Sequence, residues 1–184
     1  MFRPTLFDTE LADMPPELRW REWMGRIEAV IFASAAPVPR EDLARVVGQG
    51  ASVDLLIEDI KAELRGRPYD LVAVASGWMF RTRPHYAKAV QEAADVADQY
   101  LDLREFEIAV LAAIAYHQPL TREGLKDIFG QEVSRDLIAR LRSQGLVTVG
   151  PRSPRPGAPH TYVTTEAFLQ AFDLQSLRDL PEPT

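Results

Sequence analysis

Apolar residues along the chain recur at helical spacing in three successive segments and then switch to strand-like spacing. The first helix is predicted over residues 16–34. A second helix is predicted over 39–47, ending at Gly48, and a third over 53–65, capped by Ser52. The apolar face of the first helix comprises Trp20, Trp23, Ile27, Val30 and Ile31.

A β-hairpin is predicted directly after these helices. The strings DLVAVA and WMFRTR flank Ser76-Gly77, a dipeptide typical of a two-residue turn. Trp78, Met79 and Phe80 are consecutive, and successive side chains of a strand point to opposite faces. Either Trp78 and Phe80 or Met79 must therefore cover something other than the core.

The same order of elements is predicted in the second half. Asp102 and Glu105 form a capping-box pattern at the start of a helix over 103–116. Thr121 is predicted to cap the next helix, which ends at Gly130.

A third helix over 133–143 then precedes two short strands, LVTVG and HTYVTT. Because proline cannot donate to a central ladder, the loop PRSPRPGAP between them is predicted to stand out as a wing.

A sequence repeat at an offset of 82 residues explains this recurrence. It aligns IEAVIFASAAPVPREDLARVVG with IAVLAAIAYHQPLTREGLKDIFG, so that Pro37 meets Pro119 and Gly48 meets Gly130. An offset this long indicates a duplicated small domain rather than a solenoid. Three helices followed by a hairpin is the order of a winged helix.

We therefore predict a mainly α protein with small β-hairpin wings (α+β), built from two tandem winged-helix domains. The predicted parts are an N-terminal arm over 1–15, the first winged helix over 16–83, a helical connector over 84–101, the second winged helix over 102–172 and a loose C-terminal tail over 173–184.

Composition removes several classes of protein. The chain has 184 residues and no cysteine, which excludes disulfides, thiolate zinc sites and cysteine nucleophiles and fits a reducing cytoplasm. The longest apolar run, IAVLAAIAY, is too short to span a membrane. The net charge is −6, and most of the acidity lies in residues 1–102. Any surface that faces DNA is therefore expected in the second half.

Four stretches in order resemble the segregation and condensation protein B family. They are IEAVIFASAAPVPREDLARVVG, GWMFRTRPHYA, AIAYHQPLTREGLKDIFG and the closing LRSQGLVTVGPRSPRPGAPHTYVTTEAFLQAFDLQSLRDLPEP. The resemblance implies a non-catalytic protein without a cofactor that acts in the cytoplasm on the nucleoid. As a homodimer it would bind a kleisin subunit (ScpA-type) and, through it, an SMC ATPase, supporting chromosome condensation and segregation.

A kleisin-binding groove is predicted at the helix joint AIAYHQPLTR. An enzymatic interpretation fails because no acidic residue lies at a spacing from His117 that would orient it as a general base. The polar residues are therefore interpreted as the end of one helix and the cap of the next. A groove for an amphipathic segment needs apolar walls with polar anchors. The candidate walls are Tyr116, Pro119 and Leu120, and the candidate anchors are His117, Gln118 and Arg122.

The first winged helix has more large apolar side chains than its core requires. One interpretation is a core shared with the N-terminal arm, and the other is an interface. The resemblance implies dimerisation through this domain and favours the interface. The candidate interface residues are Trp20, Trp23, Ile27, Trp78 and Phe80.

A DNA-binding transcription regulator is the alternative function, since winged helices that read DNA insert their third helix into the major groove. The candidate contacts are Arg135, Arg140 and Arg142 on the third helix and Arg152 and Arg155 on the wing. The favoured interpretation of these arginines is solvated surface charge, because exposed arginine is common. The three histidines lack metal-ligand spacing, so no metal site is predicted, and no hydrolase constellation is present.

Overall fold

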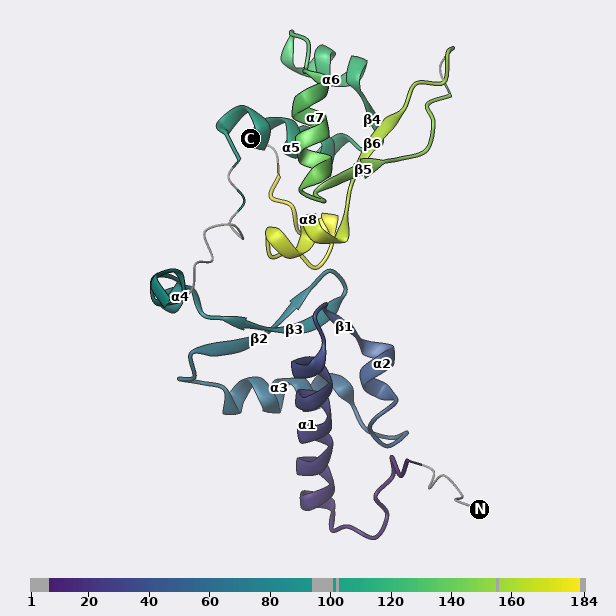
Figure 1. Cartoon of the computed structure of the whole chain (residues 1–184). Coiled ribbons are helices and arrows are strands. Elements are labelled where there is room, and N and C mark those ends of the chain that lie inside the picture. Colours follow the sequence, from purple (N-terminus) through teal and green to yellow (C-terminus); the bar gives the residue numbers. More distant parts are fainter. Residues whose placement is uncertain (1–6, 94–100, 102, 155, 183–184) are drawn as a thin grey trace, which may run out of the picture. The chain divides into compact units, whose positions relative to one another are not determined.

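The computed structural model describes residues 7–93, 101, 103–154 and 156–182, and these fall into two compact units, Met1–Ala94 and Asp95–Thr184 (Figure 1). The boundary lies inside the predicted connector. Of that connector the structure describes a 3-10 turn η1 (Pro84–Tyr86) and α4 (Ala87–Ala93), both in the first unit, and Leu101. Among the described residues, no helix is both long and apolar enough to cross a membrane.

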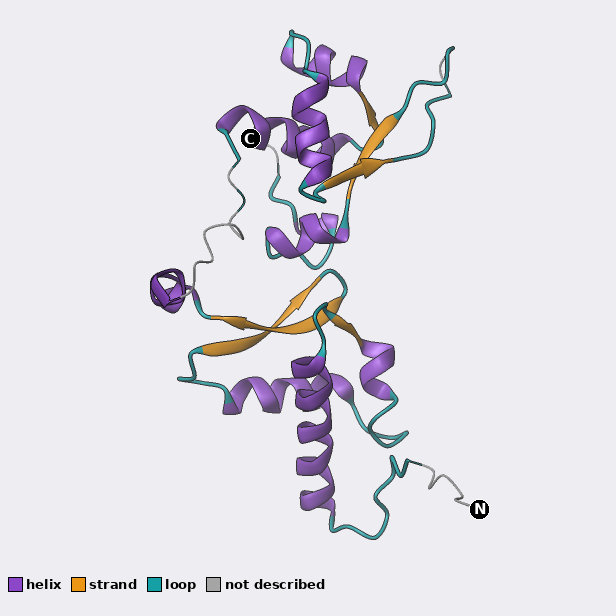
Figure 2. Cartoon of the chain, in the orientation of Figure 1, coloured by secondary structure: helices purple, strands orange, loops and turns teal. Residues whose placement is uncertain are grey.

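Besides η1 and α4, the described part of the first unit contains three helices and a three-stranded antiparallel sheet with strand order β1-β3-β2 (Figures 1 and 2). These helices and strands are α1 (Pro16–Ala33), β1 (Val38–Pro39), α2 (Arg40–Ala44), α3 (Val53–Glu63), β2 (Tyr69–Val74) and β3 (Gly77–Thr82). The core lies between α1, α3 and the sheet. Ile27 of α1 and Leu56 and Ile57 of α3 are fully buried in it.

The predicted start of α3 is confirmed. The Ser52 hydroxyl accepts a hydrogen bond from the Leu55 amide, which satisfies one of the free donors at the N-terminus of the helix. The predicted end of α2 is wrong, because the helix stops at Ala44 and Gly48 does not have a left-handed backbone. Instead, a Cβ on Gly48 would lie 2.7 Å from the Trp23 ring, so the position requires glycine for a close approach.

The hairpin turn also differs from the prediction by one position. Ala75 and Ser76, with φ of 47° and 60°, form the two-residue turn, and Gly77 is the first residue of β3. Glycine is needed there because β1 pairs with β3 at this point. A Cβ on Gly77 would lie 2.9 Å from the carbonyl carbon of Pro37.

Two glycine-to-alanine substitutions are expected to have opposite effects. Gly77→Ala should lower the free energy of unfolding by about 1–3 kcal/mol, because backbone cannot move away as a flexible side chain can. Gly25→Ala should raise it by up to about 1 kcal/mol, since Gly25 is an exposed position inside α1 with open space around it. Urea unfolding followed by tryptophan fluorescence measures both. Equal effects would contradict the assignment of Gly77 to the strand.

The second unit repeats the architecture, with strand order β4-β6-β5. Its elements are α5 (Glu105–His117), β4 (Leu120–Thr121), α6 (Arg122–Phe129), α7 (Arg135–Ser143), β5 (Val147–Val149), β6 (Thr161–Thr164), α8 (Glu166–Ala171) and the 3-10 turn η3 (Leu177–Asp179). The predicted cap and stop of α6 are confirmed, because Thr121 accepts from the Gly124 amide and Gly130 is left-handed. Both units together confirm the predicted fold class.

Two short strands, β1 and β4, were not predicted. They lie 82 residues apart, at Val38–Pro39 and Leu120–Thr121, so they belong to the repeat. Each adds a third strand to its hairpin by pairing with β3 or β6. Two residues are too few for a periodic signal, which explains why the pattern did not reveal them.

The predicted start of α5 is wrong. The helix begins at Glu105, and Glu107, rather than Glu105, accepts a hydrogen bond from the N-cap amide of Arg104. Asp102 lies outside the described residues.

The predicted loose end after α8 is also wrong over its described part. Leu174 and Leu180 pack against the core of the second unit. The Tyr116 hydroxyl of α5 donates a 2.6 Å hydrogen bond to the Pro181 carbonyl. Residues 173–182 therefore cover part of α5 and belong to the second unit.

Candidate partner-binding surfaces

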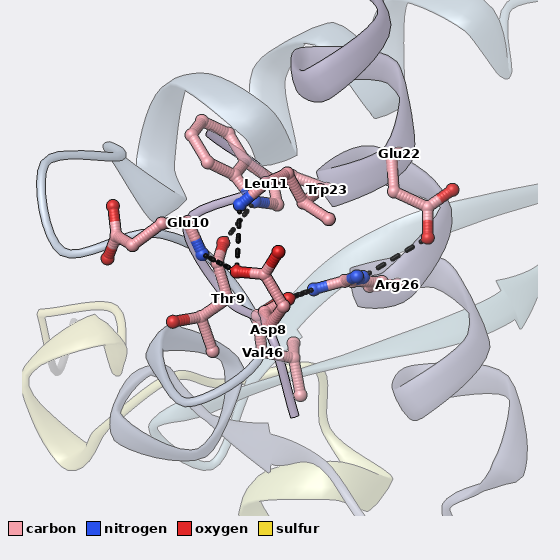
Figure 3. Close-up of polar contacts among 8 residues, drawn as sticks. All are labelled: Asp8, Thr9, Glu10, Leu11, Glu22, Trp23, Arg26 and Val46. Carbon is pink, nitrogen blue, oxygen red and sulfur yellow. Dashed lines mark hydrogen bonds and ion pairs between the residues drawn. The ribbon is translucent and has the colours of Figure 1, made fainter. Parts of the chain in front are cut away.

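The described residues of the N-terminal arm, 7–15, pack on the rest of the first unit and cover part of α1 (Figure 3). The Trp23 indole donates a 2.8 Å hydrogen bond to the Thr9 carbonyl, and the Arg26 guanidinium donates a 2.8 Å bond to the Asp8 carbonyl. Glu10 accepts from the Gln49 amide at 2.8 Å. Trp23 is therefore buried inside its own chain. This agrees with the alternative in which the arm shares the core of the first unit.

The structure places the five candidate dimer residues in different surroundings. Trp23 is buried and Ile27 has no exposed surface, so neither offers area to a partner within this conformation. The Trp20 indole, partly exposed, donates a 2.8 Å hydrogen bond to the Asp59 carboxylate. Trp78 and Phe80 are partly buried against the first core, on the same face of β3.

A groove of about 500 Å³ brings Phe80 together with an exposed aromatic side chain that the sequence pattern did not single out. Phe32, near the C-terminus of α1, is 84% exposed. Tyr69 of β2, also exposed, packs edge-on against Phe80 at 5.9 Å between ring centroids. The sequence signal that could have revealed this groove is Phe32 itself, a large apolar residue next to the buried face of the helix.

Two charged groups also line this groove. Burial raises the pKa of the Glu28 carboxyl above its ordinary value; the nearby Glu63 carboxylate adds to the rise and Arg21 opposes it. Burial lowers the pKa of the Arg81 guanidinium. The groove is therefore mainly apolar, with a carboxyl and a guanidinium that are already partly removed from water.

The polar residues of the predicted kleisin groove are mostly used inside the second unit. The Gln118 amide donates to the Ala115 carbonyl at 3.2 Å and to the Thr164 hydroxyl at 3.0 Å, and accepts from the Thr164 amide at 2.8 Å. Arg122 donates to the Val133 carbonyl at 3.2 Å. Both side chains hold the joint between α5 and α6 against the rest of the unit by hydrogen bonds. This agrees with the interpretation of these residues as parts of a helix joint.

The remaining residues of that prediction are split between core and surface. Leu120 packs against the second core, and His117 and Pro119 are exposed. Tyr116 lines an apolar groove of about 230 Å³ between α5, α8 and the residues after α8. Two of its lining residues, Ile108 of α5 and Phe172, are 47% and 40% exposed.

The described candidate DNA contacts lie in different surroundings. Arg140 pairs with the buried Glu107 carboxylate at 3.2 Å, and Arg152 donates to the Ala158 carbonyl at 3.0 Å. Arg135 and Arg142 line a groove beside β6. Arg155 lies outside the described residues. Within the described part of the chain, no cluster of histidine and carboxylate side chains is suited to hold a metal ion.

Comparisons with known proteins identify the family. The model described as "Segregation and condensation complex subunit ScpB" matches residues 25–183. A segregation and condensation protein B homolog from Coxiella burnetii is 33% identical over 160 residues, which covers 84% of this chain and 76% of that protein. The segregation and condensation protein B of Syntrophotalea carbinolica is 37% identical over 158 residues, covering 84% and 79%.

Solved structures of similar chains include ScpB from Mycobacterium tuberculosis, which is 26% identical, covers 83% of this chain and 96% of its own, and gives a TM-score of 0.39. The family match spans most of the chain, and the two relatives agree with it. The chain therefore belongs to the segregation and condensation protein B family.

Proposed function

We propose that this protein is a non-catalytic subunit of a bacterial SMC–kleisin complex, binding the kleisin as a homodimer and supporting chromosome condensation and segregation on the nucleoid in the cytoplasm. Family membership supports the role in segregation and condensation. The observation that carries the proposal is that each unit has an exposed apolar groove, lined by Phe32 and Phe80 in the first unit and by Ile108 and Phe172 in the second. Such surfaces are typical of protein interfaces.

In this proposal the first unit forms the dimer. Its interface is the groove of Phe32, Tyr69 and Phe80. Trp78 lies on the same face of β3 as Phe80, whereas Trp20 lines a separate groove beside Asp59 and is not part of this interface. Aromatic side chains are enriched in interfaces, and an 84% exposed phenylalanine has a strong drive to leave water. Trp23 and Ile27 support this surface from inside the unit rather than contact the partner.

The second unit binds the kleisin through the groove of Ile108, Tyr116 and Phe172. An amphipathic segment fits a groove that is apolar along its walls and has few polar anchors. The Tyr116 hydroxyl and the exposed His117 supply polar atoms at one end of α5. The predicted site at Tyr116–Leu120 is thereby shifted along α5, away from Leu120 and Gln118.

The test is a pull-down of this protein by the tagged kleisin encoded in the same genome. The unmodified protein should be retained, and the Ile108→Glu/Phe172→Glu variant should lose at least about 90% of the retention, because two charges would be buried in an apolar contact. Ile128→Glu is the matched control, since Ile128 of α6 is 45% exposed and lies outside this groove. Equal retention of all three proteins would contradict the assigned groove, and no retention of any would contradict the proposed function.

A further inference from the structure

A second groove of the second unit combines positive charge with an apolar floor. It has a volume of about 480 Å³ and lies between the start of α6, the exposed side of α7 and the beginning of β6. Ile138 and Tyr162 are buried or partly buried at its floor. The residues that can carry positive charge along it are Arg122, Arg135, Arg142 and His160, and the acidic one is Glu123.

This positive charge is local and does not reflect the composition of the chain. The whole protein carries a net charge of −6. The third arginine of α7, Arg140, points to Glu107 and forms an ion pair with it. Arg135 and Arg142, in contrast, are exposed and line the groove. A concave surface with an excess of one sign of charge attracts an oppositely charged ligand more strongly than isolated surface charges do.

Arg122 adds an independent observation. Its Nη2 atom donates to the Val133 carbonyl at 3.2 Å and lies 3.7 Å from the Glu132 carboxylate. That carboxylate lies closer to Lys126, at 2.8 Å. The Nε atom of Arg122 is buried and has no hydrogen-bond partner among the described residues. The Arg122 side chain as a whole is 33% exposed and lines the groove, so the accessible part of its guanidinium can meet an acceptor that enters there. A carboxylate suits a guanidinium best, because it can accept two parallel hydrogen bonds.

We infer that this groove, between α7 and β6, binds an acidic peptide segment that carries at least one apolar side chain. The apolar side chain would lie on Ile138 and Tyr162, and the carboxylates would pair with Arg122, Arg135 and Arg142. The site is separate from the α5 groove, with which it shares no residue. It does not depend on the kleisin assignment.

The shape and charge of the surface around this groove favour a peptide ligand over a nucleic acid. Double-stranded DNA gains its affinity from many phosphate contacts along an extended basic surface. Here the described basic side chains next to the groove are few, since Arg140 and Arg152 are engaged within the chain. A net charge of −6 repels a long polyanion, whereas a short acidic segment interacts mainly with the local field of the groove.

Fluorescence anisotropy with two labelled peptides tests the inference on the full chain. One peptide is a short amphipathic sequence rich in glutamate and leucine, and the other has every glutamate replaced by glutamine. The glutamate peptide should bind and the glutamine peptide should bind at least about tenfold more weakly. The Arg135→Glu/Arg142→Glu variant should weaken binding of the glutamate peptide by at least about tenfold, since like charges across a contact cost affinity.

The matched control is Arg65→Glu/Arg67→Glu, which changes the net charge equally on exposed residues of the first unit and should bind as the unmodified protein does. Arg135→Gln/Arg142→Gln removes the charges without reversing them and should give an intermediate loss. Thermal unfolding followed by circular dichroism must show that each variant is folded. Three results would overturn the inference: no binding of the glutamate peptide, equal losses in both double charge reversals, or tighter binding of a mixed-sequence DNA duplex that the Arg135→Glu/Arg142→Glu variant abolishes.

Discussion

Replacing Phe32 by aspartate is expected to dissociate the proposed dimer into monomers while leaving the first unit folded. Phe32 is 84% exposed in the single chain, so aspartate costs the isolated unit little. In the proposed dimer the same side chain is covered by the partner, and a charge there loses its hydration without a compensating hydrogen bond. Losing a central aromatic contact weakens association by at least about 30-fold.

Light scattering over a dilution series measures this change. Leu18→Asp is the matched control, because Leu18 lies on the same helix, is 56% exposed and is not part of the groove. It should remain dimeric, with an unchanged unfolding curve. A Phe32→Asp variant that dimerises as tightly as the Leu18→Asp variant would show that the dimer forms through another surface.

Replacing Glu107 by alanine is expected to lower the free energy of unfolding of the second unit by about 3 kcal/mol. This is the largest loss expected in that unit from a single exchange of a polar residue. The side chain is 6% exposed and has two partners. One oxygen accepts from the Arg104 amide at 2.8 Å and caps α5, and the other pairs with Arg140 of α7 at 3.2 Å. Alanine removes the cap and leaves a partly buried guanidinium without its carboxylate.

The two units can be followed separately in this experiment. All three tryptophans, Trp20, Trp23 and Trp78, lie in the first unit. Urea unfolding of Glu107→Ala should therefore shift the transition seen by circular dichroism and leave the tryptophan fluorescence transition in place, because each unit has its own core. Glu107→Gln keeps an acceptor for the Arg104 amide and should lose about half as much. A loss below about 1 kcal/mol for the alanine variant would contradict the role assigned to the buried carboxylate.

The repeat made most of the fold predictable from sequence. An offset of 82 residues places the same helix joint in both halves, and local chemistry then locates caps and stops such as Ser52, Thr121 and Gly130. The prediction failed where a contact with a distant segment decides the conformation. Gly48 and Gly77 read as turn glycines, but each is required because a Trp23 ring or the Pro37 backbone lies close to it.

The candidate site was less predictable for the same reason. Gln118 and Arg140 look like surface residues in a sequence, yet they bind Thr164 and Glu107, which lie far along the chain. The arm hides Trp23, and the tail contacts Tyr116. Composition and periodicity report which residues prefer to be buried; they do not report which segment covers them. Exposed Phe32 shows the converse, because the sequence pattern did not single it out and yet no segment of the described chain covers its large apolar side chain.

The mass of the complex that this protein forms with the kleisin encoded in the same genome is a direct test of the proposed function. Both would be co-expressed, purified together and measured by light scattering behind a size-exclusion column. The expected result is a stable complex that contains two copies of this chain, as the proposed function requires. Two folded proteins that elute separately, each at its own mass, would contradict it.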